Sequence, residues 1–210
     1  MLTRLLALNP ECLEPDKYDR AIGVLNDGGV IVYPTDTFYG LGANAYRPGA
    51  IERIYALKGR DEAKPLLVVV SDIEMAERTA RDLPPLFREL ATRFWPGALT
   101  LVLRAAPDLP KRLLGGGDSV AVRLPDVIWL RAMIRRAGFP VVATSANLSG
   151  EGEISTAGEA QALFDGRVEL ILDGGPTPGT KPSTVLDLTT DKPRLVREGA
   201  VPKAALERYL

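Results

Sequence analysis

The sequence predicts an α/β protein built on a mixed β-sheet. Short apolar runs, typical of buried strands, recur along the chain between amphipathic stretches with helical spacing. Some runs are separated by helical stretches, as in parallel sheets, and others follow one another without a helix, as in antiparallel pairs. A sheet of mixed strand direction, flanked by helices, accounts for both patterns.

Helices are predicted where apolar residues recur every three or four positions and a turn residue ends the pattern. In the first of them, Ala21, Val24 and Leu25 share one face, and Gly28 ends the helix. The same criteria predict helices over residues 15–26, 50–57, 72–81, 85–94, 127–137, 157–164 and 202–210.

Strands are predicted where a short apolar run is bounded by turn residues. The run 66–70 is apolar throughout, so we expect it at the centre of the sheet. The predicted strands cover residues 30–33, 66–70, 98–103, 119–124, 141–143, 170–172, 183–188 and 194–196. Strands resume directly after the Pro/Gly-rich segment 173–182, which we therefore interpret as a loop at the rim of a site, within one domain over 1–210.

Composition excludes several classes of site. Cys12 is the single cysteine and histidine is absent, which excludes an internal disulfide, a Cys-based zinc site and His-dependent catalytic triads. A net charge of −1 and a pI near 5.7 argue against a dedicated nucleic-acid binder. No apolar run approaches the roughly 18 residues that span a bilayer, so we expect a cytoplasmic protein without a membrane segment.

Residues 33–42 are the most informative stretch, with the sequence YPTDTFYGLG after a buried strand. Pro34 ends the strand because it lacks a backbone N–H. The polar groups that follow are expected to open onto a small polar ligand, since α/β sheets bind ligands at strand ends. Gly40 and Gly42 are expected to permit close approach of the backbone.

Two further segments extend this polar site. Lys58 and Arg60 end a predicted helix, where cations either compensate the helix dipole or bind an anion such as phosphate. Lys64 adds a cation to the same connection. The sequence TSAN at 144–147 follows another predicted strand and supplies hydroxyl and amide groups. Together these segments predict a site for an anionic ligand.

Seven motifs in order identify a family resemblance between residues 23 and 199. They are YPTDTFYGLG, LKGR followed by KPL, FWPGALTLVL, VAVRLP, TSANLSG, STVLDL and LVREGA. The chain resembles the YrdC/Sua5 family of L-threonylcarbamoyladenylate synthases. The resemblance implies a single YrdC-like domain with a motif-bearing core over about 15–200, a twisted mixed sheet and an open, concave basic and polar site. It also implies the short form, without the extra C-terminal domain of Sua5 proteins.

The resemblance also assigns roles to individual residues. Lys58 and Arg60 are the expected catalytic pair, neutralising charge on the nucleotide phosphates. The residues expected to bind L-threonine are Thr35, Lys64, Arg123, Ser145 and Ser183. The residues expected to bind the nucleotide are Lys58, Arg60, Ser119, Asn147, Ser155 and Arg197. From the sequence alone Arg123 is either a surface charge or a carboxylate clamp; Asp36 is a candidate for orienting the threonine-binding loop and stays outside the assigned site.

The implied reaction joins L-threonine, bicarbonate or CO2 and ATP into L-threonylcarbamoyl-AMP, with release of pyrophosphate. The carbamate oxygen is itself the nucleophile, so the protein must supply positioning and charge neutralisation. Mg²⁺ is expected on the triphosphate, without protein ligands. Partner proteins of the t6A pathway would transfer the threonylcarbamoyl group to tRNA.

Two other functions remain open. One is a binding module for double-stranded RNA or for ribosome maturation, which would use the same basic groove; the acidic pI and the lack of interleaved aromatic and basic residues argue against it. The other is a carbamoyl-adenylate enzyme like the related domain of hydrogenase-maturation carbamoyltransferases. Those enzymes carry acylphosphatase and zinc-finger parts that this sequence lacks.

Overall fold

The computed structural model describes residues 2–179 and 181–210; Thr180, within the predicted loop 173–182, lies outside them, as does Met1. The strands are β1 (Arg4–Ala7), β2 (Ile31–Pro34), β3 (Tyr39–Gly42), β4 (Leu67–Val69), β5 (Leu99–Arg104), β6 (Ser119–Arg123), β7 (Val141–Ser145), β8 (Leu170–Asp173), β9 (Thr184–Asp187) and β10 (Arg194–Arg197). The helices are α1 (Pro15–Asn26), α2 (Pro48–Lys58), α3 (Ile73–Thr79), α4 (Pro85–Phe94), α5 (Ile128–Ala137), α6 (Ala157–Phe164) and α7 (Lys203–Leu206), and a 3₁₀ turn (Glu207–Tyr209) follows.

The described strands form one sheet in the order β1-β8-β2-β3-β7-β4-β6-β5-β9-β10. Four neighbouring pairs are parallel (β1 with β8, β2 with β8, β4 with β6, β5 with β9), and the other five are antiparallel. The prediction of a mixed sheet is therefore confirmed. The apolar strand β4 lies near the middle of the order, as its continuous hydrophobicity predicts.

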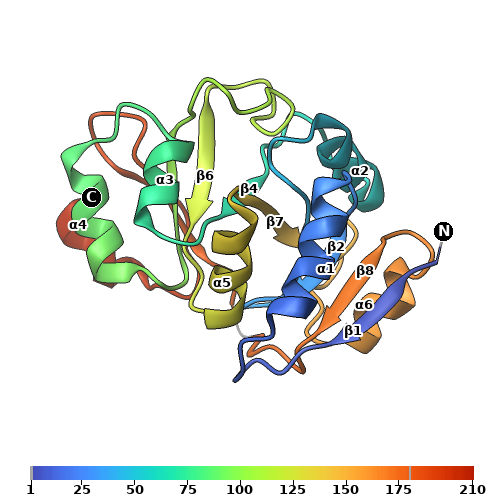
Figure 1. The fold of residues 1–210 in the computed structure, drawn as a ribbon. Helices are drawn as coiled ribbons and strands as arrows, with labels where there is room; N and C mark the ends of the chain where they lie inside the picture. The colour runs from blue at the N-terminus through green and yellow to red at the C-terminus, as the bar shows by residue number, and fades with distance from the viewer. Residues whose placement is uncertain (1, 180) are drawn as a thin grey trace.

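Helices α1 and α5 lie side by side against the sheet, and the rings of Tyr18 and Trp129 pack between them with centroids 6.3 Å apart (Figure 1). At the far edge, the C-terminal segment packs beside α4, where the rings of Phe94 and Tyr209 meet edge to face at 6.4 Å. The first strand therefore borders one edge of the sheet and the last helix the other. No helix of the described residues is long and apolar enough to cross a membrane.

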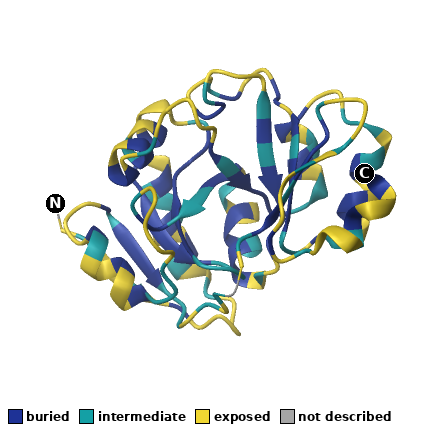
Figure 2. Ribbon diagram, turned by 180° about the vertical axis from the view of Figure 1, so that it is seen from behind, coloured by how far each residue is buried: buried dark blue, intermediate teal, exposed yellow. Residues whose placement is uncertain are grey.

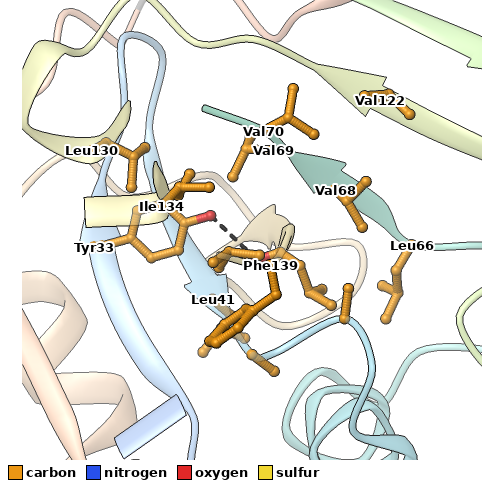
Figure 3. Close-up of a cluster of buried hydrophobic side chains, with 14 of the residues drawn as sticks. Tyr33, Leu41, Leu66, Val68, Val69, Val70, Val122, Leu130, Ile134 and Phe139 are labelled. Atoms are coloured by element: carbon orange, nitrogen blue, oxygen red, sulfur yellow. Dashed lines mark hydrogen bonds between the residues drawn. The ribbon is translucent and has the colours of Figure 1, made fainter. Parts of the chain in front are cut away.

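The central strands all contribute buried residues; β2 and β3 are buried throughout, whereas β4, β6 and β7 also carry residues of intermediate burial (Figure 2). Their side chains meet Leu130 and Ile134 of α5 in one cluster (Figure 3). Within it, the hydroxyl of Tyr33 donates to the backbone oxygen of Val142 at 3.2 Å. Burial raises the pKa of Tyr33, so this hydroxyl remains a donor. The bond ties β2 to β7 across the intervening strand β3.

The segment 39–42 is a strand, although we predicted no strand after Pro34 and expected its two glycines to allow close approach of the backbone to a ligand. Strand β3 pairs antiparallel with β2, in a hairpin that matches Pro34 with Tyr39 and Ile31 with Gly42. A Cβ on Gly42 would lie 2.5 Å from Cε1 of Tyr33, so this glycine makes room for the buried ring. Its role is core packing rather than approach to a ligand. Strand β1 was not predicted either; it pairs with β8 at the edge of the sheet.

Candidate functional site

The last residue of α2 is Lys58, and its side chain is buried, with 3% of the residue exposed. The helix ends there because Gly59 adopts a left-handed conformation, with φ of 57° and ψ of 34°. The backbone N–H groups of Gly59 and Arg60 donate to carbonyl oxygens of the last helical turn. Gly59 therefore terminates the helix at the edge of the pocket that it helps to line.

The Lys58 ammonium is held by the loop that follows β7. Its Nζ donates to the backbone oxygen of Asn147 at 2.7 Å, to the side-chain Oδ1 of Asn147 at 2.9 Å and to the backbone oxygen of Ser145 at 2.5 Å. An ammonium has three N–H donors, so these contacts use its full donor capacity. Lys58 thus fixes Ser145 and Asn147, the serine and the asparagine of the TSAN segment.

The same loop is braced by its own side chains. The Ser145 hydroxyl donates to Oδ1 of Asn147 at 2.6 Å, and Nδ2 of Asn147 donates to the backbone oxygen of Glu151 at 2.7 Å. The backbone N–H of Ser149 donates to the carbonyl oxygen of Lys58 at 2.9 Å. The loop therefore closes over the end of α2. Residues 58–60 and residues 145–147 form one connected unit.

A pocket of about 340 Å³ lies at this junction, and three of its walls are cationic side chains. The lining residues are Lys58, Gly59, Arg60, Asp61, Lys64, Ser145, Asn147, Ser149 and Gly150. Arg60 is partly exposed and donates to the backbone oxygens of Lys64 and Pro65 at 3.4 and 3.1 Å. The structure thus brings together five of the residues expected at the site, in a pocket suited to an anion.

Electrostatics distinguish Lys58 from the other cations of the pocket. Burial and, to a smaller extent, the positive charge of Arg60 lower the pKa of Lys58 to about 8, against the opposing effect of the Glu153 carboxylate. At pH 7 the ammonium is mostly charged. Its charge is nevertheless sensitive to mildly alkaline pH, which is unusual for lysine.

A second group forms around Arg123, the last residue of β6, which is 5% exposed. Its Nε donates to the backbone oxygen of Gly97 at 2.9 Å, and Nη1 donates to Oγ1 of Thr37 at 3.4 Å. Its Nη2 lies 2.6 Å from Oδ1 of Asp36. The buried pairing excludes the interpretation of Arg123 as an ordinary surface charge.

The turn between β2 and β3 joins this group through Thr35. The Thr35 hydroxyl donates to the backbone oxygen of Phe38 at 2.8 Å and accepts from the backbone N–H of Thr37 at 3.1 Å. The Oγ1 atoms of Thr35 and Thr37 are 3.0 Å apart. Thr35 thus shapes the tight turn, and Thr37, which the sequence interpretation passed over, is the hydroxyl that contacts Arg123.

A third group joins Ser183 and Arg197. Oγ of Ser183 lies 2.8 Å from Oγ1 of the buried Thr100, and Nη2 of Arg197 donates to the backbone oxygen of Ser183 at 2.8 Å. Partial burial lowers the pKa of Arg197, the nearby charge of Arg123 lowers it further, and Glu153 opposes both. Arg197 is therefore a charged neighbour of the Arg123 group.

The sheet register relates Arg123 to the strand that ends at Ser145. Val69 pairs with both Arg123 of β6 and Val141 of β7. Ser145 lies four residues beyond Val141, or about 13 Å along the strand. The Glu153 carboxylate raises the pKa values of both Lys58 and Arg197, and desolvation raises its own pKa. No sequence pattern pointed to Glu153.

Two predicted nucleotide contacts, Ser119 and Ser155, are held outside the lining of the cationic pocket. Ser119 begins β6, four residues before Arg123, at the end of the sheet near Lys64 and Pro65. Ser155 precedes α6, where its backbone N–H donates to Glu159 at 2.9 Å and its carbonyl oxygen accepts from the Thr177 N–H at 2.9 Å. Neither residue lines the pocket beside Lys58.

A larger pocket of about 460 Å³ adjoins Thr35 but is lined largely by prolines and apolar side chains. Its walls are Pro10, Pro34, Thr35, Asp126, Val127, Ile128, Trp129, Gly174, Pro176, Thr177 and Pro178. Lysine and arginine are absent from these lining residues. The smaller pocket, with its three cations, is therefore the better candidate for binding phosphate.

Comparison with known proteins shows which proteins this chain is similar to. The threonylcarbamoyl-AMP synthase of Bacillus subtilis is 42% identical over 192 residues, which cover 91% of this chain and 56% of that protein. The structure of P. abyssi Sua5 complexed with L-threonine superposes with a TM-score of 0.92 at 37% identity, over 100% of this chain and 61% of that one. The match to the crystal structure of E. coli YciO covers 100% of both chains, with a TM-score of 0.90 at 28% identity.

The chain spans only about six tenths of the length of the first two of these proteins. The family model for Sua5, YciO and YrdC, described as "Telomere recombination", matches residues 23–199, which are most of the chain. The match includes the hairpin turn at 35–38, the cationic pocket, Arg123 and Arg197. The chain therefore belongs to the Sua5/YciO/YrdC family.

Proposed function

We propose that this protein makes L-threonylcarbamoyl-AMP from L-threonine, bicarbonate or CO2 and ATP, with release of pyrophosphate. The observation that carries the proposal is the presence of two recognition regions on one sheet: the pocket of Lys58, Arg60 and Lys64, and the buried guanidinium of Arg123. One region suits phosphates and the other a carboxylate. The name of the Bacillus relative and the threonine complex of P. abyssi Sua5 support the same assignment.

In the proposed reaction, the neutral threonine amine forms an N–C bond to CO2 and loses a proton, which gives the carbamate. A carbamate oxygen then attacks the α-phosphorus of ATP. The bond from that phosphorus to the bridging oxygen breaks, and pyrophosphate leaves with the electron pair. Neither step requires a covalent nucleophile from the protein, so the side chains act by positioning and by electrostatic stabilisation.

The hydrogen bonds suggest a division of work within the expected catalytic pair. Arg60 is partly exposed and Lys64 is exposed, so both would contact the phosphates directly; for Lys64 this replaces the role in threonine binding that the resemblance implies. The buried Lys58 would add its positive charge to the pocket while it holds Ser145 and Asn147 in place. Thr35, Arg123 and Ser183 would bind threonine, and Ser119, Ser155 and Arg197 remain predicted nucleotide contacts.

Mg²⁺ is expected to arrive with ATP. The described residues contain no cluster of three or more His, Cys, Asp or Glu side chains that could hold a metal ion. Asp61 borders the cationic pocket, but its Oδ1 accepts from the backbone N–H of Ala63 at 2.9 Å. Mg²⁺ in nucleotide sites takes phosphate and water ligands readily, so these residues fit an ion carried by the triphosphate, where it would neutralise charge.

Transfer of the threonylcarbamoyl group to tRNA by partner proteins, as the first step toward t6A, is part of the same proposal. Cytoplasmic location also stays a prediction.

The test is pyrophosphate release from ATP and bicarbonate, with L-threonine, with L-serine or with no amino acid. We expect release that depends on threonine, together with the mass of threonylcarbamoyl-AMP. Arg60→Gln should abolish it, whereas Arg88→Gln, the same charge change on the distant helix α4, should not (Figure 1). ATP binding without amino-acid-dependent release would contradict the proposal. Salt-dependent RNA binding would then favour the RNA-binding alternative.

A further inference from the structure

Asp36 and Arg123 form an ion pair that is sealed from solvent. Oδ1 of Asp36 lies 2.6 Å from Nη2 of Arg123, and the two side chains are 17% and 6% exposed. Both of these atoms are fully buried, and neither has an aligned hydrogen bond within the described residues. The other carboxylate oxygen of Asp36 accepts from the backbone N–H of Asp126 at 3.3 Å. Asp36 is therefore fixed between the end of β6 and the segment that follows it.

This pairing leaves Nη1 as the guanidinium nitrogen with the weakest contact to the protein. Nε is occupied by the backbone oxygen of Gly97 at 2.9 Å, and Nη2 is covered by Asp36. Nη1 has only a long contact, 3.4 Å, with the hydroxyl of Thr37. A carboxylate that approaches Arg123 can therefore recruit Nη1, with the Thr37 hydroxyl beside it, without breaking the ion pair.

We propose that Asp36 is a positioning residue for amino-acid binding: it holds Arg123 through Nη2, so that Nη1 and the Thr37 hydroxyl receive the carboxylate of the substrate. This inference rests on the proposed function, because it takes threonine as the ligand of Arg123. It adds two residues, Asp36 and Thr37, to those expected at the site. Thr37 would be the direct contact, and Asp36 would act through Arg123.

An opposite role is conceivable for a carboxylate in this place. Asp36 could occupy the position of the substrate carboxylate and be displaced when threonine binds. The two roles predict opposite signs. Neutralising a competitor strengthens threonine binding, whereas neutralising a positioning residue weakens it. The burial of both contact atoms favours positioning, because a competing contact would have to open to the ligand.

The experiment measures the dissociation constants of L-threonine and of a non-hydrolysable ATP analogue by calorimetry, for the wild type and for Asp36→Asn. Asparagine keeps the shape of the side chain and removes its charge. We expect threonine binding to weaken about tenfold, as when one member of a buried charge pair is neutralised, with binding of the analogue changed less than about twofold. Asp36→Ala should weaken threonine binding further.

Asp118→Asn is the matched control, because Asp118 pairs with Arg104 at 3.2 Å in an exposed ion pair. It should change neither dissociation constant. Thermal unfolding of each variant checks that the fold is retained, and Thr37→Val should weaken threonine binding while leaving the analogue unaffected.

Four results would overturn the inference. They are tighter threonine binding by Asp36→Asn, unchanged threonine binding by a folded Asp36→Ala, equal weakening for both ligands, and the absence of threonine binding by the wild type. The assay reads binding rather than turnover, so it separates the two proposals. Normal wild-type turnover with unchanged threonine binding in the variants would contradict the role of Asp36 alone. Threonine binding that depends on Asp36, without pyrophosphate release, would contradict the reaction alone.

Discussion

Lys58 and Asn147 are joined by two hydrogen bonds across 89 residues of sequence, from Nζ to the backbone oxygen at 2.7 Å and to Oδ1 at 2.9 Å. Because both acceptors belong to one residue, the end of α2 is firmly connected to the loop after β7. Any change at Lys58 therefore reaches the loop as well as the pocket. This coupling makes the pocket sensitive to the protonation of a single lysine.

The first prediction concerns the titration of Lys58, whose pKa of about 8 results from burial and from Arg60, opposed by Glu153. Arg60→Gln removes a positive neighbour, so the pKa of Lys58 should rise. Glu153→Gln removes a negative neighbour, so the pKa should fall. NMR of the lysine ε-methylene groups against pH measures both shifts.

The same titration predicts that the turnover rate falls at alkaline pH, as Lys58 loses its charge. At pH 9, one unit above a pKa near 8, about a tenth of the Lys58 side chains keep their charge. Turnover should therefore fall through pH 8 in the wild type and at lower pH in Glu153→Gln. A pH profile that is flat to pH 9.5, while NMR shows Lys58 deprotonating, would show that its charge is not required.

The second prediction separates the stability effects of the expected catalytic pair. Lys58→Ala removes a buried ammonium from three acceptors in the loop 145–147, so the free energy of unfolding should fall by about 1–3 kcal/mol. Arg60→Ala removes a partly exposed side chain and should cost less than about 1 kcal/mol. Urea unfolding measures both.

Both alanine variants should lose turnover, but only Lys58→Ala should also loosen the loop. We expect faster amide hydrogen exchange at residues 147 and 149 in that variant, and unchanged exchange there in Arg60→Ala. Equal destabilisation by the two substitutions would argue against the division of roles proposed for them.

The third prediction uses the hydroxyl pair beneath the proposed threonine site. Thr100 is fully buried, and its Oγ1 lies 2.8 Å from Oγ of Ser183. Thr100→Val keeps the shape and removes the hydrogen bond, so the free energy of unfolding should fall by about 1 kcal/mol. Because Ser183 loses a partner, threonine binding should also weaken.

Thr79→Val is the control for Thr100, since Thr79 is equally buried and its hydroxyl donates to the backbone oxygen of Met75 at 2.7 Å in α3. It should lower stability to a similar extent and leave threonine binding intact. If both variants bind threonine normally, Ser183 does not depend on Thr100 for its function.

The fourth prediction concerns the close approach of Gly199 to the chain around Ser183. A Cβ at Gly199 would lie 2.2 Å from the backbone oxygen of Pro182 and 2.7 Å from the carbonyl carbon of Ser183. Gly199→Ala must therefore displace backbone, and should lower the free energy of unfolding by about 1–3 kcal/mol.

Gly158→Ala provides the contrast, because Gly158 lies in α6 with open space around its Cβ position. Alanine there should raise stability by up to about 1 kcal/mol through helix propensity. Thermal unfolding of the two variants should therefore show shifts of opposite sign. If Gly199→Ala leaves the stability unchanged, the backbone near Ser183 can shift at little cost in free energy.

The hairpin of β2 and β3 shows where prediction from sequence stops. The alternation of apolar runs and helices predicted most elements, and the motifs predicted which residues gather at the pocket. The same local pattern nevertheless predicts that Gly40 and Gly42 allow close approach of the backbone to a ligand. Gly42 lies under the ring of Tyr33, and that contact depends on strand pairing rather than on local composition.

The sequence by itself determined the mixed α/β class, the position of the apolar strand β4 and the residue types for binding an anion and a carboxylate. These follow from local periodicity and side-chain chemistry. Only the tertiary structure decided which polar groups are already occupied: all three donors of Lys58 by the loop 145–147, and Nη2 of Arg123 by Asp36. The physical reason is that these partners lie more than 80 residues apart, so their pairing results from how the sheet brings distant segments together.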